Sequence, residues 1–243
     1  MLNIRGLSYS VETDKGTQSI LKNVDLDIDS GRFVVITGPN GSGKTTLAKA
    51  IMGLIKPDSG TISYNGADIT GLSVTERAKL GISYGFQQPP RFKGLLVTDL
   101  LSIAAGRDMQ EGEYCSYLTQ VGLCTSDYLG REIDAALSGG ELKRIEIATI
   151  LARGASLMIF DEPEAGIDLW SFTRLTDTFR SIHQNTGATI IIISHQERII
   201  RLADELVLIS GGEITQRGSV ESVLPQILDD TVPECAYIGE AAI

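Results

Sequence analysis

Basic residues are scarce in this sequence, and their scarcity argues against one broad class of partner. The 243 residues include 21 Lys and Arg against 31 Asp and Glu, which gives a formal net charge of −10. Nucleic-acid binding depends on clustered Lys and Arg side chains that neutralise phosphates. We therefore expect no general affinity for nucleic acid, and the acidic surface of a membrane is disfavoured for the same reason.

Long hydrophobic runs are missing too. The longest one, residues 188–193, is far shorter than the roughly 20 apolar residues that cross a bilayer. The N-terminal stretch MLNIRGLSYS also lacks the apolar core of a secretory signal. These absences predict a cytoplasmic protein that inserts no segment of its own into a membrane.

Cysteine is equally rare. Cys115, Cys124 and Cys235 are odd in number and widely spaced. This pattern predicts neither a disulfide framework nor a pair of zinc ligands. Inert thiols are the expectation, and a reactive thiol that takes part in metal-cluster chemistry is the alternative.

What the sequence does contain is enough apolar material for a sizeable core, at 42% of its residues. Residues 2–9 and 20–28 alternate apolar with polar side chains, as half-buried antiparallel strands do. Residues 33–37, 157–160 and 189–193 are instead continuously apolar, which is typical of strands covered on both faces. Helix-like segments follow these runs, as in parallel sheets with crossover helices.

These patterns predict an α/β fold in a single domain that spans residues 1–243. We expect residues 1–88 and 155–243 to form a parallel core sheet with an antiparallel β subdomain. Residues 89–154 are expected to form a helical subdomain. Near the end of the chain a Gly-Gly pair indicates a hairpin, after which residues 220–228 are predicted to form a short helix.

The strongest chemical signal is GPNGSGKTT, residues 38–46, between the buried run FVVIT and the helix-like TLAKAIMGL. It fits the phosphate-binding loop pattern G-x-x-x-x-G-K-[ST], in the strand-to-helix context that the pattern requires. Lys44 is expected to reach the β- and γ-phosphates, and Thr45 to ligate Mg²⁺. The alternative is a glycine-rich turn that only caps the helix. The predicted nucleotide-binding residues of this loop are Gly38, Asn40, Gly41, Ser42, Gly43, Lys44, Thr45 and Thr46.

Two further strand ends carry candidate catalytic groups. LMIFDEP ends a buried run with adjacent carboxylates, so Asp161 is expected in the Mg²⁺ shell and Glu162 at the attacking water. Exposed acids at a strand end are the alternative. ISHQE places His195 after another buried run, where it can donate to a γ-phosphate oxygen. His183 lies in a helical stretch and is predicted to be a surface residue.

The stretch LSGGE, residues 137–141, begins a further predicted helix with Ser138, Gly139 and Gly140 at its start. The first N–H groups of a helix lack partners and the macrodipole is positive there, so this is a natural seat for an anion. Nothing upstream of it looks like the rest of a phosphate site. The sequence alone therefore leaves the identity of that anion open.

Together, GPNGSGKTT, LSGGE, LMIFDEP and ISHQE resemble the motifs of the ATP-binding cassette (ABC) ATPases, and the resemblance covers nearly the whole chain. It implies a P-loop NTPase fold of the ABC type and hydrolysis of ATP with Mg²⁺. It also implies a head-to-tail dimer in which a second copy of the chain completes the ATP site. In that dimer Ser138, Gly139 and Gly140 face the γ-phosphate held by the other copy.

Other site residues follow from the same resemblance. It implies that Tyr9 stacks on adenine, Gln87 lies near Mg²⁺ and the attacking water, and Asp168 reaches across the dimer. An ordinary strand aromatic is the alternative for Tyr9, and Gln88 competes with Gln87. The expected catalytic residues are Glu162, His195, Lys44 and Gln87, and the expected Mg²⁺ residues are Thr45, Gln87 and Asp161.

Three segments look like those of the SufC-type ATPases of iron-sulfur cluster assembly: residues 76–95, the ELKRIEIATIL that follows the signature, and DEPEAGIDLWSF. This finer resemblance implies that the ATP-driven dimer changes the conformation of a SufB-like scaffold protein. The main alternative is the nucleotide-binding ATPase subunit of an ABC membrane transporter, since fold alone does not decide between partners. A regulatory ATP sensor with little turnover is a third possibility.

Overall fold

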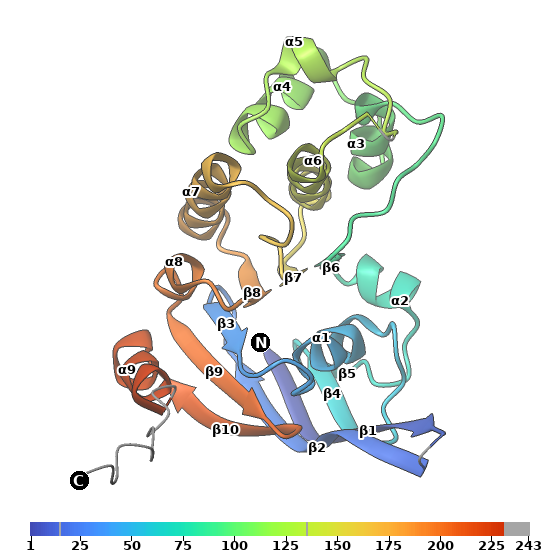
Figure 1. The fold of residues 1–243 in the computed structure, drawn as a ribbon. Coiled ribbons are helices and arrows are strands. Elements are labelled where there is room, and N and C mark those ends of the chain that lie inside the picture. Colours follow the sequence, from blue (N-terminus) through green and yellow to red (C-terminus); the bar gives the residue numbers. More distant parts are fainter. Residues whose placement is uncertain (15, 135, 231–243) are drawn as a thin grey trace, which may run out of the picture.

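The structure is a computed structural model, and it describes residues 1–14, 16–134 and 136–230. Its β-strands lie in one half of the molecule and helices α3 to α6 in the other (Figure 1). Within the described residues the strands form a 4-stranded sheet and a 6-stranded sheet. This mixed α/β architecture is the fold class that the sequence predicts.

The 4-stranded sheet is antiparallel, with the order β2-β1-β4-β5. Its hydrophobic side chains alternate with polar ones along β2, so Leu21, Val24 and Leu26 are buried between exposed neighbours. That alternation is the reason one face of this sheet packs on the core. Its strands are β1 (Leu2–Thr13), β2 (Gly16–Ile28), β4 (Ser59–Tyr64) and β5 (Ala67–Asp68).

The 6-stranded sheet has the order β10-β9-β3-β8-β7-β6 and is parallel except for β10, which pairs antiparallel with β9. Every residue of β3, β7 and β8 is buried, as their continuous apolar runs predict. The strands are β3 (Phe33–Thr37), β6 (Ile82–Gly85), β7 (Leu157–Asp161), β8 (Thr189–Ile193), β9 (Glu205–Ser210) and β10 (Glu213–Gly218).

Alternate side chains of the central strand β3 enter two different cores. Phe33 and Val35 belong to the cluster that contains the helical side of the molecule. Val34 and Ile36 belong to the cluster shared with the antiparallel sheet and helix α1 (Lys44–Met52). The parallel sheet is therefore the middle layer of the molecule, covered on both faces.

The helices lie along the chain at positions close to those expected. Residues 97–152 hold four of the helices described here, and Leu96 pairs with Glu132 in an isolated bridge beside them. Besides α1, the described helices are α2 (Val74–Lys79), α3 (Val97–Ala105), α4 (Glu111–Gln120), α5 (Thr125–Tyr128), α6 (Gly139–Ala152), α7 (Leu169–Thr186), α8 (Glu197–Ile200) and α9 (Val220–Asp230).

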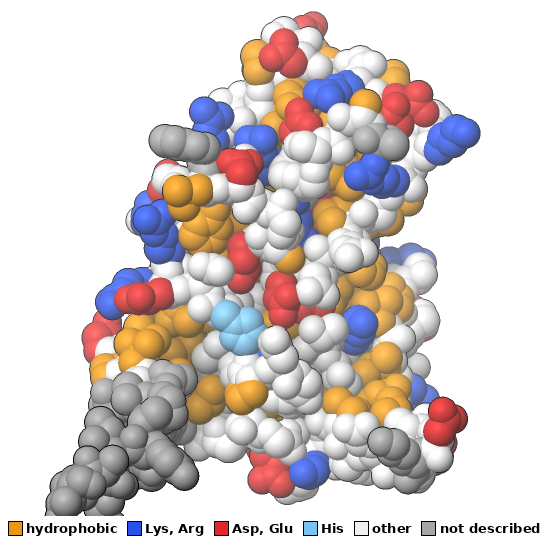
Figure 2. Space-filling view, viewed as in Figure 1, with side chains coloured by type: hydrophobic (Ala, Val, Ile, Leu, Met, Phe, Trp, Pro, Cys, Tyr) orange, Lys and Arg blue, Asp and Glu red, His pale blue; other side chains and the backbone are white. Residues whose placement is uncertain are grey.

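None of these helices, across the described parts of the chain, combines the length and hydropathy needed to cross a bilayer. On the face shown in Figure 2, Lys and Arg side chains are scattered among acidic ones instead of forming a continuous patch. Cys115 and Cys124 are free and exposed, in α4 and directly before α5. Cys235 lies outside the described residues.

His183 is not the surface residue that the sequence predicts. It lies on α7, and its ring packs edge-on against Phe33 with the centroids 5.5 Å apart. Its Nε2 is 3.5 Å from a carboxylate oxygen of Asp204, and its side chain is 26% exposed. The ring packs toward Phe33 because this turn of α7 faces the parallel sheet.

A buried arginine holds the end of helix α1 in place. Arg77 is 1% exposed and donates to the carbonyls of Ala50 at 2.6 Å and Ile51 at 2.8 Å. It also donates to the carbonyls of Leu72 and Thr70. The last carbonyls of a helix lack partners within the helix, so this guanidinium satisfies them and complements the helix dipole.

We predict that Arg77→Met lowers the free energy of unfolding by about 3 kcal/mol, because it leaves buried carbonyls without donors. Urea denaturation followed by circular dichroism measures this change. The control is Arg5→Met, which removes an exposed ion pair to Asp27 and should cost less than about 1 kcal/mol. Equal losses in the two variants would contradict the role given to Arg77.

Candidate functional site

The loop between β3 and α1 has the close backbone contacts expected of a phosphate-binding loop. Gly38 has φ +141°, and a β-carbon there would lie 1.9 Å from the carbonyl oxygen of Ile209 on β9. Gly43 has φ +104°, and a β-carbon there would lie 2.8 Å from the carbonyl oxygen of Ile20. Glycine is therefore required at both positions, because neighbouring backbone fills the space of a side chain.

This loop surrounds a pocket of about 290 Å³. Among the described residues, Ser42 has a buried hydroxyl with no hydrogen-bond partner, which is a chemical fit for a phosphate oxygen. Ile20 from β2 also lines the pocket, whereas Tyr9 is half-buried against the core beneath the antiparallel sheet. The lining residues are Ile20, Asn40, Gly41, Ser42, Gly43, Lys44, Thr45, Thr46 and Glu162.

Lys44 lies folded back on its own loop. Its ammonium donates to the carbonyl oxygens of Gly38 at 2.7 Å and Pro39 at 2.8 Å, and the residue is 5% exposed. Burial lowers the pKa of Lys44, while the nearby Glu162 and Asp161 oppose that effect. A phosphate group at this loop would replace the carbonyls as the partner of the lysine.

Asp161 lies at the end of β7, is 2% exposed and accepts two hydrogen bonds. Thr45 Oγ1 donates to one carboxylate oxygen at 2.9 Å and the hydroxyl of Tyr84 donates to the other at 2.8 Å. Burial raises the pKa of Tyr84, and the adjacent Asp161 raises it further, so the phenol stays protonated as a donor. No sequence motif marks Tyr84, which lies on the strand ISYG three residues before the predicted Gln87.

These oxygen donors fit Mg²⁺. The ion is usually held by one or two protein oxygens together with phosphates and waters. The hydroxyl of Thr45 beside the carboxylate of Asp161 supplies such a pair. Within the described ranges no group of three or more His, Cys, Asp or Glu side chains is arranged to hold a metal ion.

Glu162 follows Asp161 in an uncommon backbone conformation, with φ +43°. Its N–H donates to the carbonyl of Ile193 on β8 at 3.0 Å, and its carboxylate accepts from Gln87 Nε2 at 2.6 Å. Positive φ in a residue other than glycine costs about 1–3 kcal/mol and clusters at functional sites. The predicted catalytic glutamate and the glutamine Gln87 therefore lie side by side.

His195 lies exposed just after β8, on the other side of the loop. It lines a second pocket, of about 600 Å³, with Gly38, Asn40 and Ile227. Burial lowers the pKa of His195, and the positive charge of Lys44 lowers it further, so the neutral imidazole is favoured near pH 7. A neutral ring can still donate one N–H to an oxygen.

Glu164 is another residue that the sequence analysis missed. It is half-buried and accepts a hydrogen bond from Ser194 Oγ at 2.5 Å, directly before His195 in the chain. Burial raises the pKa of Glu164, although the hydrogen bond from Ser194 opposes the rise. In the sequence it stands only as the third acid of DEPE, two residues after the predicted catalytic Glu162.

The LSGGE stretch forms the start of α6 but does not line the pocket of its own phosphate-binding loop. Ser138 caps this helix, and its hydroxyl accepts the N–H of Glu141 at 3.2 Å. Gly139 lines a different pocket, together with Gln87 and Gly166. A β-carbon at Gly140 would lie 4.0 Å from a carboxylate oxygen of Asp168, so the two predicted cross-dimer elements lie together.

A polar cluster fixes the conformation of this helix start. The carboxylate of Glu141 accepts the N–H of Ser138 at 2.7 Å and the hydroxyl of Tyr128. Arg131 pairs with Glu141 at 3.1 Å and lies over the ring of Tyr128. Burial tends to raise the pKa of Glu141, but the hydrogen bonds from Tyr128 and Ser138 outweigh it and lower the pKa to about 2.

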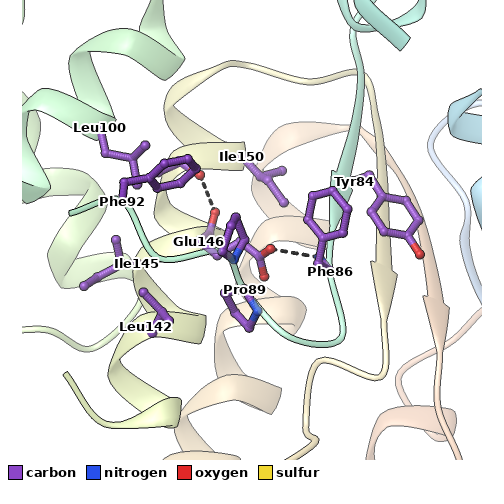
Figure 3. Close-up of a pocket in the computed structure, with 11 residues that line it drawn as sticks. Tyr84, Phe86, Pro89, Phe92, Leu100, Leu142, Ile145, Glu146 and Ile150 are labelled. Carbon is purple, nitrogen blue, oxygen red and sulfur yellow. Dashed lines mark hydrogen bonds between the residues drawn. The ribbon is translucent and has the colours of Figure 1, made fainter. Parts of the chain in front are cut away.

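A small apolar groove of about 170 Å³ lies beside Gln87, between the end of β6 and the helices α3 and α6. Figure 3 shows the α6 residues Glu146 and Ile150 between Phe86 and Phe92. Phe86 is 38% exposed and Phe92 is 39% exposed, so the groove is open to a partner. Its lining residues are Tyr84, Phe86, Pro89, Pro90, Phe92, Leu100, Leu142, Ile145, Glu146, Thr149 and Ile150.

Comparisons with known proteins agree on one family. Residues 21–165 match the family described as ABC transporter. An uncharacterized ABC transporter ATP-binding protein of Methanocaldococcus jannaschii is 37% identical over 217 residues, which is 86% of each chain. The sulfate/thiosulfate import ATP-binding protein CysA of Caulobacter vibrioides is 33% identical over 96% of this chain and 69% of its own length.

Solved structures share the fold. A dimeric, post-hydrolysis ATP-binding cassette bound to ADP and Pi superimposes with a TM-score of 0.81 at 22% identity, covering 90% of this chain and 99% of that one. A bacterial Atm1-family ABC exporter with ATP bound has a TM-score of 0.80 at 22% identity, over 93% of this chain and 40% of the exporter. The named relatives are transporter proteins, and none of those named is of the SufC type.

We predict that Glu141 stabilises the fold in a pH-dependent way. Its pKa of about 2 lies below the ordinary value of 4.5, so the folded chain binds this proton more weakly than the unfolded chain. The stabilisation is complete above pH 4.5 and is lost as the pH falls toward 2. Unfolding free energies of the wild type and Glu141→Gln, measured across this range, should converge as the pH falls; a constant difference would contradict the prediction.

Proposed function

Because the chain belongs to the ABC transporter family and is an ATPase of that family, we propose that it is the ATP-hydrolysing subunit of a membrane transporter. The observation that carries this proposal is its similarity over 96% of its length to an import ATP-binding protein. The open apolar groove beside Gln87 supports it, because a separate subunit needs a surface on which to dock.

The proposed working form is a head-to-tail pair of copies. Each chain carries a phosphate-binding loop, but the start of α6 with Ser138 lines no part of that pocket. A second copy supplies the missing side when its Ser138, Gly139 and Gly140 face the γ-phosphate. The dimeric cassettes among the structural neighbours are consistent with this arrangement.

In this proposal hydrolysis transfers the γ-phosphoryl group of ATP to water. Glu162 takes a proton as the water oxygen forms its bond to phosphorus and the bond to the ADP oxygen breaks. Gln87 orients the same water through its contact with Glu162. Lys44 and His195 stabilise the charge that develops on the phosphoryl oxygens. Thr45 and Asp161 would hold Mg²⁺, which neutralises charge on the β- and γ-phosphates when it is bound.

Two further binding residues, Tyr9 and Asp168, belong to this proposal. Tyr9 would stack on adenine, yet Ile20 is the residue of the antiparallel sheet that lines the loop pocket. Asp168 would reach the second copy from its place beside Gly140. The role of Asp168 depends on the geometry of the dimer.

The finer resemblance to SufC gains no support from the relatives. Their printed names describe transporter ATP-binding proteins, which favours a membrane subunit over a SufB-like scaffold as the partner. The resemblance of the three segments, residues 76–95, ELKRIEIATIL and DEPEAGIDLWSF, is therefore the basis that is left for the scaffold role. The transporter reading replaces it as the main proposal.

We predict that Glu162→Gln leaves ATP binding intact and lowers turnover by about 10²–10⁴-fold, because the general base is lost. ATP should then hold two copies together, and size-exclusion chromatography with ATP should show the dimer. The control is Glu197→Gln, which changes an exposed surface glutamate that pairs with Arg201. A monomeric Glu162→Gln variant with normal hydrolysis would refute both the role of Glu162 and the dimer.

The identity of the partner has its own test. We predict that the tagged chain, purified from detergent-solubilised membranes, brings down a polytopic membrane protein. Phe92→Asp places a charge in the apolar groove and should reduce that recovery at least about tenfold, since an unpaired charge in an interface is costly. Ile103→Asp, on an exposed α3 residue outside the groove, should leave it unchanged. Recovery of a soluble protein that carries iron and sulfide would instead support the scaffold role.

A further inference from the structure

A buried ion pair on α6 binds both backbone polar groups of Phe86, in the segment that leads to Gln87. Lys143 is 1% exposed and Glu146 is 9% exposed, and their charged atoms are 3.1 Å apart. Glu146 accepts the N–H of Phe86 at 2.8 Å, and Lys143 donates to the carbonyl oxygen of the same residue. Both polar groups of the Phe86 backbone are therefore held by side chains one helical turn apart. Figure 3 shows the hydrogen bond between Glu146 and Phe86.

Folding alone gives little reason for charges at these positions. A buried ion pair is expensive to desolvate, and hydrophobic residues of similar volume often replace one with no loss of stability. Apolar residues already flank the pair on α6, for example Leu142 and Ile145. The pair does, however, satisfy a donor and an acceptor of a segment that has no helix or strand of its own at Phe86.

Phe86 lies where three parts of the site meet. Its ring packs edge-on against Tyr84, with centroids 5.0 Å apart, and Tyr84 donates to Asp161. The next residue in the chain, Gln87, donates to Glu162. The exposed part of the Phe86 side chain lines the groove.

We propose that Lys143 and Glu146 are positioning residues for ATP hydrolysis. They fix the backbone N–H and carbonyl of Phe86, so that the side chain of Gln87 stays within hydrogen-bond distance of Glu162. Neither side chain lines the loop pocket, so their effect on that pocket passes through Phe86. Lys143 also lines the pocket that Gly139 shares with Gln87. The inference rests on the proposed roles of Gln87, Glu162 and the groove. A partner segment bound in the groove would contact the Phe86 side chain. Phe86 connects to Asp161 through Tyr84, and to Glu162 through Gln87.

The test is the double variant Lys143→Met/Glu146→Leu, which keeps the volume and removes both anchors. We expect a folded protein whose urea midpoint is below that of the wild type, because the N–H and carbonyl of Phe86 lose their partners. KM for ATP should stay within about twofold, and kcat should fall at least about tenfold. The matched control is Arg180→Met/Asp177→Leu, which removes an exposed pair of the same helical spacing on α7. The control should change neither kcat nor KM.

A rescue variant separates anchoring from charge. In Lys143→Met/Glu146→Gln the amide offers both an acceptor for the Phe86 N–H and a donor for its carbonyl. We expect it to recover most of the lost kcat. Wild-type turnover in the Met/Leu variant, failure of that variant to fold, or a Gln variant no faster than the Leu variant would each overturn the inference.

The same assays distinguish this inference from the proposal on which it rests. If Glu162→Gln hydrolyses ATP at the normal rate, the proposed mechanism itself is wrong. If Glu162→Gln is inactive while Lys143→Met/Glu146→Leu is fully active, the mechanism stands and only the positioning role is wrong.

Discussion

The site depends on one buried carboxylate, that of Asp161. A carboxylate that is 2% exposed is stable only where donors replace the water it has lost. Here the donors come from two other elements, Thr45 on α1 and Tyr84 on β6. The requirement therefore ties the phosphate-binding loop, the strand end and the segment before Gln87 into one rigid group. These three segments form one site because the Asp161 carboxylate needs hydrogen-bond donors from both of the others.

The parts of the fold that the sequence predicts are those whose signal is local. FVVIT and TIIII are buried along their full length because they lie inside a covered sheet, and the glycines of GPNGSGKTT are required by close backbone. Strands β4 and β5 and helix α2 have no comparable apolar run. β5 has two residues at the edge of its sheet, and α2 has six residues that are held in part by long-range contacts. Arg77 illustrates this, since its carbonyl partners at Ala50 and Ile51 are far from it in the chain.

The residues missed in the site are those that work through tertiary contacts. Tyr84 can donate to Asp161 only when β6 lies beside β7, and Glu146 can accept the N–H of Phe86 only when α6 lies beside that residue. His183 was misjudged for the same reason, because helical periodicity did not reveal that Phe33 and Asp204 lie against it. The identity of the partner was harder still to predict, because a groove offers a surface for docking but does not identify the protein that binds there. The similarity to transporter proteins, and not the geometry, directs that choice.

The central strand β3 also has a consequence for how the chain comes to be folded. Its neighbours β8 and β9 pair with it from the far end of the sequence, Phe33 with Ile190 and Val34 with Glu205. During synthesis the apolar FVVIT segment therefore leaves the ribosome long before either flanking strand exists. Until then neither core can close, and contacts so distant in sequence form slowly. The nascent N-terminal half must carry an unpaired hydrophobic strand for most of translation, which makes it a natural client for a chaperone.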